Sequence, residues 1–581
     1  MLKKRITQLV PAISWIRHYS PSYLKGDLNA GLTVGIMLIP QGMAYAVLAG
    51  LPPIYGLYSS MVPLILYALF GTSRQLAVGP VAMVSLLVVA GVGEITEVGS
   101  DRFIQLAIMT ALGVGALQLL MGLFRMGFLV NFLSHPVLNG FTSAAALIIG
   151  ASQIKNLLGI DLPRTNYVHE IIIGVVRRAS EIEPFTAAIG LGSIILIIAI
   201  RKWKSTFPSA LVVVVAGTLI TALFGLDARG VAIVGDIPTG LPAFQTVFVS
   251  LNDLQQLLPI ILVISLVGYM ESIAVAKAIA NKHGYKVDPN QELVGLGVAN
   301  IGGAFFQAYP TTGGFSRTAV NDQAGARTGM ASLISAGIIA LTVVFLTPYF
   351  YYLPMAVLAS VIIVAVAGLF DAREMKELWE KDRRDFAMLA VTFIATLSLG
   401  IEQGILVGVV LSLAVVIYSS ARPHSTELGR LGDSKTYRNI SRYTDANVRD
   451  DILIYRFDSQ LYFANVEFFR EDLEEHIARK GEALKLVVLE ASAISSIDST
   501  GVHTLNELIT ELFNRGVRFS IAGAIGPVRD KLKICGVVSR MGEDSFWFDV
   551  DEAVEHFTHQ KDGRKDGDKA PANHSPLQSN V

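Results

Sequence analysis

Long apolar runs separated by short polar connections fill the chain from about residue 28 to residue 419. A helix needs about 20 apolar residues to cross a bilayer, and the runs predict two sets of seven membrane segments. The third member of each set is visibly too short to span. The first set lies near residues 28–48, 54–70, 79–93, 103–123, 127–150, 184–200 and 208–225, and the second near 254–280, 289–307, 312–323, 329–347, 354–370, 385–400 and 402–419.

Both short segments are interrupted by unusual residues. Residues 73–92, SRQLAVGPVAMVSLLVVAGV, contain Gly79-Pro80, and residues 309–327, YPTTGGFSRTAVNDQAGAR, place polar and charged residues where a membrane helix is normally apolar. We interpret them as half-helices whose N-termini meet inside the bilayer. Broken helices at matching positions of two repeats indicate a transporter's binding site. Their free N–H groups and positive dipole ends would face an anion.

An odd number of segments per repeat requires the two repeats to have opposite orientations. With the N-terminus inside, most Lys and Arg of the short connections fall on the cytoplasmic side, as the positive-inside rule requires. The acidic loop at 93–101, GEITEVGSD, falls outside. Arg177-Arg178 is the exception, and the neighbouring run IIIGVV predicts an amphipathic surface helix there.

After Tyr418 the apolar runs give way to alternating strand and helix patterns, which predict a small α/β domain with helices against one sheet. The final residues are polar and rich in Pro and Gly, which predicts disorder. The predicted domains are a cytosolic N-terminal segment at 1–26, a transmembrane domain at 27–420 with repeats 27–225 and 254–420, a linker at 421–444, an α/β domain at 445–557 and a tail at 558–581.

Composition agrees with a polytopic membrane protein: 52% of the 581 residues are hydrophobic, 16% are charged, and the mean hydropathy is +0.51. A net charge of -1 gives no indication of nucleic-acid binding. The single cysteine, Cys535, excludes an internal disulfide framework and a cysteine-rich metal site. No phosphate-binding loop, metal-ligand cluster or nucleophile elbow is present in the expected context. We therefore expect no enzyme, cofactor or metal. The N-terminal residues lack an apolar core followed by a cleavage site, so we also expect no cleaved signal peptide.

The second interrupted segment supplies the more polar candidates. Ser316 follows Gly313-Gly314-Phe315 at the position expected of an N-cap, so its hydroxyl and the nearby N–H groups suit an oxyanion. A plain cap without a ligand is the alternative. Arg317 is a cation inside the membrane, which is costly unless it faces a water-filled cavity or pairs with a carboxylate.

The first interrupted segment offers backbone rather than side chains. Gly79 permits close approach, and Pro80 suits the first helical position, where its missing N–H has no cost. Val81 and Ala82 would then direct N–H groups at the ligand. The alternative is a kink at a helix junction.

Glu271 lies midway along the apolar run LVISLVGYMESIAVAKAIA. Desolvation favours the protonated form of such a carboxylate. Protonation would remove a negative charge beside the anion site, let the anion bind and allow the loaded site to cross, which predicts proton coupling through Glu271. A salt bridge with Arg317 or Lys277 is the structural alternative, and the two interpretations can coexist.

These motifs together resemble one family. Residues 27–58, DLNAGLTVGIMLIPQGMAYAVLAGLPPIYGLY, are similar to the signature of the sulfate permease (SulP) family, whose animal relatives include prestin and pendrin. Residues 71–88, 280–306 and 314–326 match the same family in order. Residues 494–505, ISSIDSTGVHTL, resemble the core of a STAS domain, the sulfate-transporter and anti-sigma-factor-antagonist module.

The resemblance implies a homodimeric secondary anion transporter with a 14-segment, seven-plus-seven inverted-repeat helical fold and a cytosolic α/β STAS domain. A core of segments one to four and eight to eleven would move as an elevator against a gate domain. Gln41, after Pro40, would be a polar ligand of the anion and Tyr45, one helical turn later, an aromatic wall. The remaining residues implied in the anion pocket are Gly79, Val81, Ala82, Phe315, Ser316 and Arg317.

Other positions bear on coupling and regulation. Plant and bacterial proton-coupled members have an acid at the place of Glu271, whereas sodium-coupled bicarbonate relatives carry Asp and Thr where this chain has Glu271 and Ser272. Thr500 matches the phosphorylated position of bacterial anti-sigma antagonists, and a helix cap is the alternative there. We expect the STAS domain to support the dimer and to contact a cytosolic partner.

The resulting expectation is proton-coupled uptake of an inorganic oxyanion, with sulfate favoured, by a multi-pass protein of a bacterial inner membrane. The N-terminus and the STAS domain would be cytoplasmic, and membrane lipid, H⁺ and the anion would be the remaining partners. Sodium-coupled bicarbonate transport, dicarboxylate transport, anion exchange and a channel remain alternatives. An anion-sensing signalling protein is the alternative from a different class.

Overall fold

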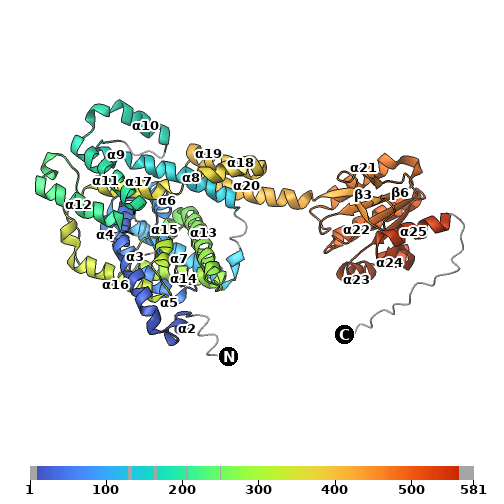
Figure 1. The fold of residues 1–581 in the computed structure, drawn as a ribbon, viewed down its shortest axis with the longest axis horizontal. Helices are drawn as coiled ribbons and strands as arrows, with labels where there is room; N and C mark the ends of the chain where they lie inside the picture. Colours follow the sequence, from blue (N-terminus) through green and yellow to red (C-terminus); the bar gives the residue numbers. More distant parts are fainter. Residues whose placement is uncertain (1–9, 129–133, 163–166, 204–206, 249, 562–581) are drawn as a thin grey trace. The chain divides into compact units, whose positions relative to one another are not determined.

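A computed structural model describes residues 10–128, 134–162, 167–203, 207–248 and 250–561. The chain divides into two compact units between Leu413 and Ala414, and Figure 1 shows the helices of the first and the mixed sheet of the second. Within the described residues, eight helices are long and apolar enough to cross a membrane, and three more apolar helices are shorter. The first unit is therefore a multi-span helical membrane domain.

Each of the predicted membrane segments overlaps one or two helices in the described residues, and part of the segment predicted near 127–150 lies outside them. The first repeat contains α3 (Pro21–Leu48), α4 (Pro53–Ser59), α5 (Val62–Phe70), α6 (Ala82–Gly93), α7 (Asp101–Leu123), α8 (His135–Ser152), α9 (Ile154–Leu158), α10 (Val168–Arg177), α11 (Pro184–Trp203) and α12 (Ser209–Phe224). The second contains α13 (Leu251–Lys282), α14 (Pro289–Ala304), α15 (Phe315–Gln323), α16 (Met330–Phe345), α17 (Met355–Ala367), α18 (Ala372–Lys381), α19 (Arg383–Leu399) and α20 (Ile401–Ala421). A short helix, α2 (Ala12–Arg17), precedes them.

Helix boundaries follow local capping chemistry. Ser20 accepts a hydrogen bond from Ser22 N and is followed by Pro21 at the first helical position of α3. The Asp288 carboxylate caps α14 in the same way, accepting from Asn290 N at 2.9 Å, and Pro289 follows it. Such caps satisfy N–H groups that the apolar interior could not.

Glycines set the closest helix contacts in the membrane unit. A Cβ added at Gly115 of α7 would lie 2.6 Å from Ile301 N and 2.8 Å from Gly297 O of α14. At Gly297 an added Cβ would be 2.6 Å from Leu119 N. Since no side chain fits at either position, the two backbones approach as small residues allow in membranes.

The second unit is an α/β domain built on one mixed sheet. Its strand order is β4-β3-β6-β7-β8-β9, with β5 also pairing β3. The strands are β3 (Ser425–Leu431), β4 (Tyr437–Asn439), β5 (Ala446–Asn447), β6 (Ile452–Phe457), β7 (Leu486–Glu490), β8 (Arg518–Ala522) and β9 (Phe546–Trp547). β6 to β9 pair in parallel, and β3 is antiparallel to β6.

Both faces of this sheet are covered. On one face, buried side chains of α21 (Val466–Lys480), α22 (Ser499–Asn514), α23 (Gly526–Ile534) and α24 (Val537–Met541) form one core with the sheet. On the other face, α25 (Val550–Lys561) packs on Ile452, Ile454 and Val488. The alternating strands and helices predicted for the α/β domain are present.

Two predicted segments contain more structure than expected. Residues 421–444, predicted as a linker, include β3 and β4, because the alternating side chains of STELGRL pair with β6 at the sheet edge. The predicted tail begins inside α25, which continues to Lys561, and the rest of that tail lies outside the described residues.

Candidate functional site

The two interrupted segments meet in a two-stranded sheet. β1 (Val78–Gly79) pairs antiparallel with β2 (Thr312–Gly313), and Gly79 lies opposite Thr312. α6 begins three residues after β1 and α15 two residues after β2. The structure therefore confirms both interruptions and brings the N-termini of the two half-helices to one place.

Neither half-helix has a side-chain cap. The first N–H groups of a helix have no partner within it, and two N-termini together supply donors and about half a positive charge each. At these positions the backbone of Val81 and Ala82 on one side, and of Phe315 and Ser316 on the other, suits an anion. Phe315 and Ser316 are exposed, whereas Val81 and Ala82 are buried.

Two details of the predicted helix starts are wrong. The N-cap of α15 is Gly314, not Ser316, because Gly314 is still extended and the chain becomes helical at Phe315. α6 begins at Ala82 with the extended Val81 as its N-cap, so Pro80 precedes the helix instead of occupying its first position. α6 therefore starts two residues later than predicted, because the chain stays extended beyond β1, whereas α15 starts two residues earlier, directly after β2 and the extended Gly314.

Arg317 joins the two half-helices. Its side chain is buried, and Nη1 donates to Pro80 O at 2.6 Å, whereas Nη2 is buried without a hydrogen-bond partner among the described residues. A Cβ at Gly79 would lie 3.2 Å from Nη1, and one at Gly314 would lie 2.8 Å from Nε and Nη2. Glycine at both positions therefore leaves the space that the guanidinium fills.

Gln41 and Tyr45 approach from α3, which contains Pro40 within the helix. Both side chains are buried, and neither makes a side-chain hydrogen bond to a described residue. Arg317 and Glu271 both lie near the Tyr45 side chain. A buried polar group without a partner is costly, so these free groups are consistent with a ligand between α3 and the half-helices.

Glu271 lies on α13 next to β2. Its Oε2 is buried. Among the described residues, this oxygen has no hydrogen-bond partner, and the carboxylate forms no ion pair with Arg317 or Lys277. Its charge nevertheless interacts with that of Arg317. The adjacent Ser272 hydroxyl contacts Thr312 Oγ1 at 2.6 Å and accepts from Gly313 N at 2.8 Å, which holds α13 against the strand. The salt-bridge alternative is absent from this structure.

Two buried carboxylates that the sequence did not indicate hold the segments in place. Glu292 of α14 accepts from Tyr67 Oη at 2.5 Å and from Thr72 N at 2.6 Å, just before β1. Asp27 of α3 accepts from Arg327 N at 2.6 Å and Thr328 N at 3.0 Å, just after α15. Each carboxylate belongs to one repeat and holds the loop of the other. Only the long-range fold makes these residues distinctive.

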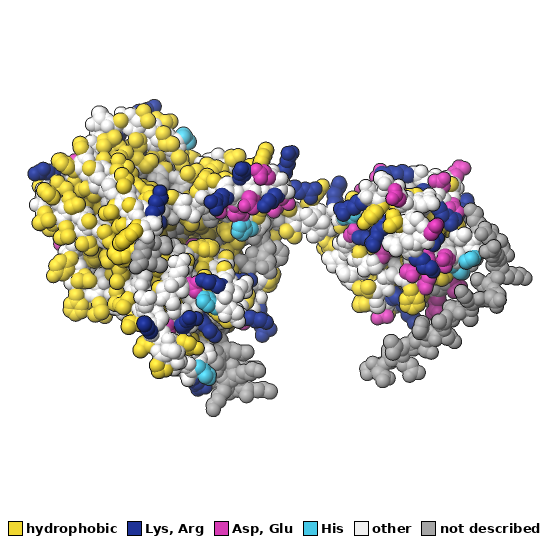
Figure 2. Space-filling model, in the orientation of Figure 1, with side chains coloured by type: hydrophobic (Ala, Val, Ile, Leu, Met, Phe, Trp, Pro, Cys, Tyr) yellow, Lys and Arg dark blue, Asp and Glu magenta, His cyan; other side chains and the backbone are white. Residues whose placement is uncertain are grey.

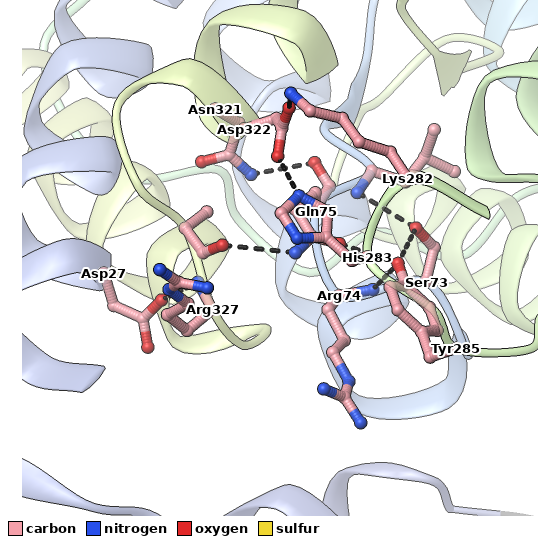
Figure 3. A network of polar contacts seen from close by, with 12 residues as sticks. Asp27, Ser73, Arg74, Gln75, Lys282, His283, Tyr285, Asn321, Asp322 and Arg327 are labelled. Carbon is pink, nitrogen blue, oxygen red and sulfur yellow. Dashed lines mark hydrogen bonds and ion pairs between the residues drawn. The ribbon is translucent and has the colours of Figure 1, made fainter. Parts of the chain in front are cut away.

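The chain leading into β1 runs beside α15 and is fixed to it by polar contacts (Figure 3). Asn321 Nδ2 donates to Gln75 O at 2.8 Å, and Tyr285 Oη donates to Gln75 Oε1 at 2.6 Å. Asp322 at the end of α15 pairs with Lys282 at 2.6 Å and with His283. The network ties the end of α15 to the end of α13, which carries Glu271.

In the second unit, Thr500 lies exposed in the first turn of α22. Asp498 caps this helix by accepting from Gly501 N at 2.8 Å, and its other oxygen accepts from Phe463 N at 2.9 Å. Thr500 is therefore not the capping residue. Its regulatory phosphorylation and a cytosolic partner at this domain stay predictions.

Comparison with known proteins identifies the family of this chain. The profile described as the sulfate permease family matches residues 24–392, and the STAS domain profile matches residues 443–553. This chain belongs to the sulfate permease family. It is 44% identical to sulfate transporter 4.1 (chloroplastic) of Arabidopsis thaliana over 95% of this chain and 82% of that protein. It is also 35% identical to high affinity sulfate transporter 2 of Stylosanthes hamata, over 94% and 86%.

A solved relative shares the whole architecture of this family member. The murine Solute Carrier 26 family member A9 anion transporter in the inward-facing state superposes with a TM-score of 0.89 at 27% identity, covering 96% of this chain and 95% of that one. The fold is thus that of a multi-span anion-transporter family with a C-terminal α/β STAS domain. The half-helix site described above lies within the matched family region.

Proposed function

We propose that the protein is a secondary active transporter that takes up an inorganic oxyanion, with sulfate as the favoured substrate and protons as the coupling ion. The observation that carries this proposal is the β1–β2 pairing, which gathers two uncapped helix N-termini around Arg317, whose Nη2 has no partner among the described residues. The names of the plant relatives support sulfate as the first substrate to test.

The charges of the pocket suit a divalent anion. Arg317 contributes one positive charge, and each helix N-terminus contributes about half a charge. An ionised Glu271 would cancel part of this, and a protonated Glu271 would not. Gln41 and Ser316 offer neutral donors, while Tyr45 and Phe315 border the pocket with aromatic surface. The anion-binding set is Gln41, Tyr45, Gly79, Val81, Ala82, Phe315, Ser316 and Arg317.

Coupling is assigned to Glu271. Protonation removes a negative charge from the wall of the pocket in a low-dielectric environment, where charge interactions are strong. The anion and the proton then stabilise each other's binding, which is a reciprocal coupling. The Glu271 Oε2 has no hydrogen-bond partner among the described residues, and the carboxylate forms no ion pair there, which supports this role because no protein cation neutralises it directly.

For translocation we infer an elevator in which α3–α7 and α13–α16 form the core and the other membrane helices form the gate of a homodimer. The hydrogen bonds of Asp27 and Glu292 support a core that moves as one body, since each carboxylate binds a loop of the other repeat. We also propose a bacterial inner membrane as the location. The distribution of Lys and Arg supports an orientation with the N-terminus and the STAS domain in the cytoplasm.

Sodium-coupled bicarbonate transport is less well supported by the site. The Ser272 hydroxyl, at the place of a Thr in such relatives, is engaged with Thr312 and with Gly313 N. Dicarboxylate transport, exchange and a channel remain alternatives, because a helix dipole selects charge rather than chemical identity. An anion sensor would bind sulfate without accumulating it.

The deciding experiment is uptake of labelled sulfate and bicarbonate into proteoliposomes, with and without inward proton or sodium gradients. We expect sulfate to be concentrated only under the proton gradient. Accumulation driven by a sodium gradient would show that sodium, and not the proton, is the coupling ion. Conductance without accumulation would indicate a channel. Sulfate binding without any uptake would indicate a sensor.

A further inference from the structure

α10 carries an apolar strip that no described residue covers. Ile171 is buried and packs with Ile160 and Leu162, which holds the helix on the membrane unit. The side chains of Ile172, Ile173 and Val176 are 53%, 47% and 72% exposed. Glu170 and Arg177 lie on the polar side of the same helix. One side of α10 therefore packs on the membrane unit through Ile171, and a second apolar side is exposed.

α18 has the same character on the other repeat. Leu378 and Met375 are half-buried, Trp379 is 56% exposed, and no residue of the helix is fully buried. Apart from Ala372, its remaining positions are charged, and Figure 2 shows charged side chains gathered over α18 beside the hydrophobic surface of the membrane unit. Trp379 is a residue whose amphipathic ring suits a membrane–water interface.

The two helices occupy equivalent places in the repeats. α10 lies between the fifth and sixth membrane segments of the first repeat, and α18 lies between the fifth and sixth of the second. Because the repeats have opposite orientations, equivalent places fall on opposite faces of the bilayer. An amphipathic helix with exposed apolar side chains therefore occurs on both faces of the bilayer. Membrane lipid is present at both faces, so it is the partner that explains both helices.

Chain connectivity keeps the C-terminal end of α18 beside the start of α19. A single residue, Asp382, separates α18 from α19, and its carboxylate caps α19 by accepting from Arg384 N at 3.0 Å. One residue spans at most about 3.6 Å. The C-terminal end of α18 is thus held near the level at which α19 would enter the membrane, and a helix that lies along the surface from this point would bring its apolar side to the headgroup–acyl boundary.

We propose that α10 and α18 are a matched pair of interfacial helices that bind lipid in opposite leaflets, α10 through Ile172, Ile173 and Val176 and α18 through Trp379. Together they fix the depth of the gate segments that flank them. Residues 371–385 carry five basic and six acidic side chains, so attraction to anionic lipid contributes little and burial of apolar surface drives the binding of α18. This holds whichever anion the protein carries.

The single cysteine of the chain makes the test direct. In a Cys535→Ser background, single cysteines at Val176 and Trp379 report the apolar sides, and Arg177→Cys and Glu377→Cys are matched controls one turn or less away on the polar sides. Spin labels in nanodiscs are compared for access to oxygen, which concentrates in lipid, and to a water-soluble nickel chelate. We expect the oxygen-to-nickel ratio at 176 and 379 to exceed that at 177 and 377 several-fold.

The accessibility measurements distinguish membrane lipid from water and from a protein partner at the two apolar sides. High nickel access at 176 and 379 would overturn the proposal, and protection from both reagents would overturn it in favour of a protein partner such as a second copy. A second measurement avoids altering Trp379: with Trp15, Trp203 and Trp547 replaced by Phe, brominated phosphatidylcholine should quench Trp379 fluorescence strongly. Quenching that requires added anionic lipid would refute the apolar mode of binding.

Discussion

The two half-helices share a geometry and differ in chemistry. α6 is apolar, AMVSLLVVAGVG, and its first turn is buried, so it offers an anion only backbone N–H groups and a dipole. α15, FSRTAVNDQ, adds the hydroxyl of Ser316 and the charge of Arg317, and its end is fixed by Asp322 to α13. One half therefore supplies a fixed electrostatic background, and the other supplies the groups that distinguish and respond to a ligand.

Removing the charge from the polar half should have the largest effect. Arg317→Ala leaves two helix dipoles without a full positive charge, and it leaves Pro80 O without its donor. We expect sulfate uptake to fall at least about 100-fold, which corresponds to roughly 2.7 kcal/mol. Arg317→Lys should recover only part of this loss, because an ammonium cannot reproduce the planar fork. Arg327→Ala, exposed in the same stretch, is the control, and wild-type uptake by Arg317→Ala would contradict the site.

The second prediction concerns the carboxylate that faces the polar half. Glu271→Gln mimics the protonated state permanently, so anion binding should survive while stimulation of uptake by external acid disappears. In the wild type, uptake should rise as external pH falls through the range in which Glu271 titrates, since the protonated form favours the anion. Initial rates from pH 5 to 8 measure this. Glu94→Gln, on an exposed residue, should keep the acid response; concentration of sulfate by Glu271→Gln under a proton gradient would end the coupling assignment.

The glycines before the two helices sharpen the comparison. A Cβ at Gly314 would meet Arg317 Nε and Nη2 at 2.8 Å, a closer contact than the 3.2 Å from Gly79 to Nη1. We expect Gly314→Ala to raise the sulfate Kd about tenfold, or about 1.4 kcal/mol, and Gly79→Ala to raise it less. Binding isotherms on purified protein measure the order. Gly150→Ala in α8 has open space within 4 Å and should change nothing; equal effects at Gly79 and Gly314 would speak against the proposed asymmetry.

The smallest effects are expected from the carboxylates that hold the loops. Glu292→Gln and Asp27→Asn each keep one acceptor oxygen but weaken several buried hydrogen bonds, which should lower stability by about 1–3 kcal/mol per site. Thermal unfolding in detergent, followed with and without sulfate, should show a lower Tm for both. The exposed Glu97→Gln is the matched control. A variant with unchanged Tm would mean that its loop is held by other contacts.

The order and number of membrane segments, the two interruptions and most of the α/β domain could be predicted from sequence, because each depends on local periodicity. The half-helices were recognisable since Gly79-Pro80 and Gly313-Gly314 break apolar runs that would otherwise continue. The amphipathic helix at 168–177 was predicted for the same reason. Patterns of this kind depend only on residues that are close in sequence, so they can be recognised without knowledge of the tertiary structure.

What the sequence could not provide depends on contacts between distant residues. α6 begins two residues after its predicted start because the chain is still extended beyond β1, whereas α15 begins two residues before its predicted start, directly after the extended Gly314. β3 became a strand because β6 lies beside it. Asp27 and Glu292 gained their roles from loops about 220 to 300 residues away. The sequence by itself determined which segments break in the membrane, whereas the tertiary structure alone decided what each break faces, because burial and hydrogen-bond partners exist only after the repeats have packed together.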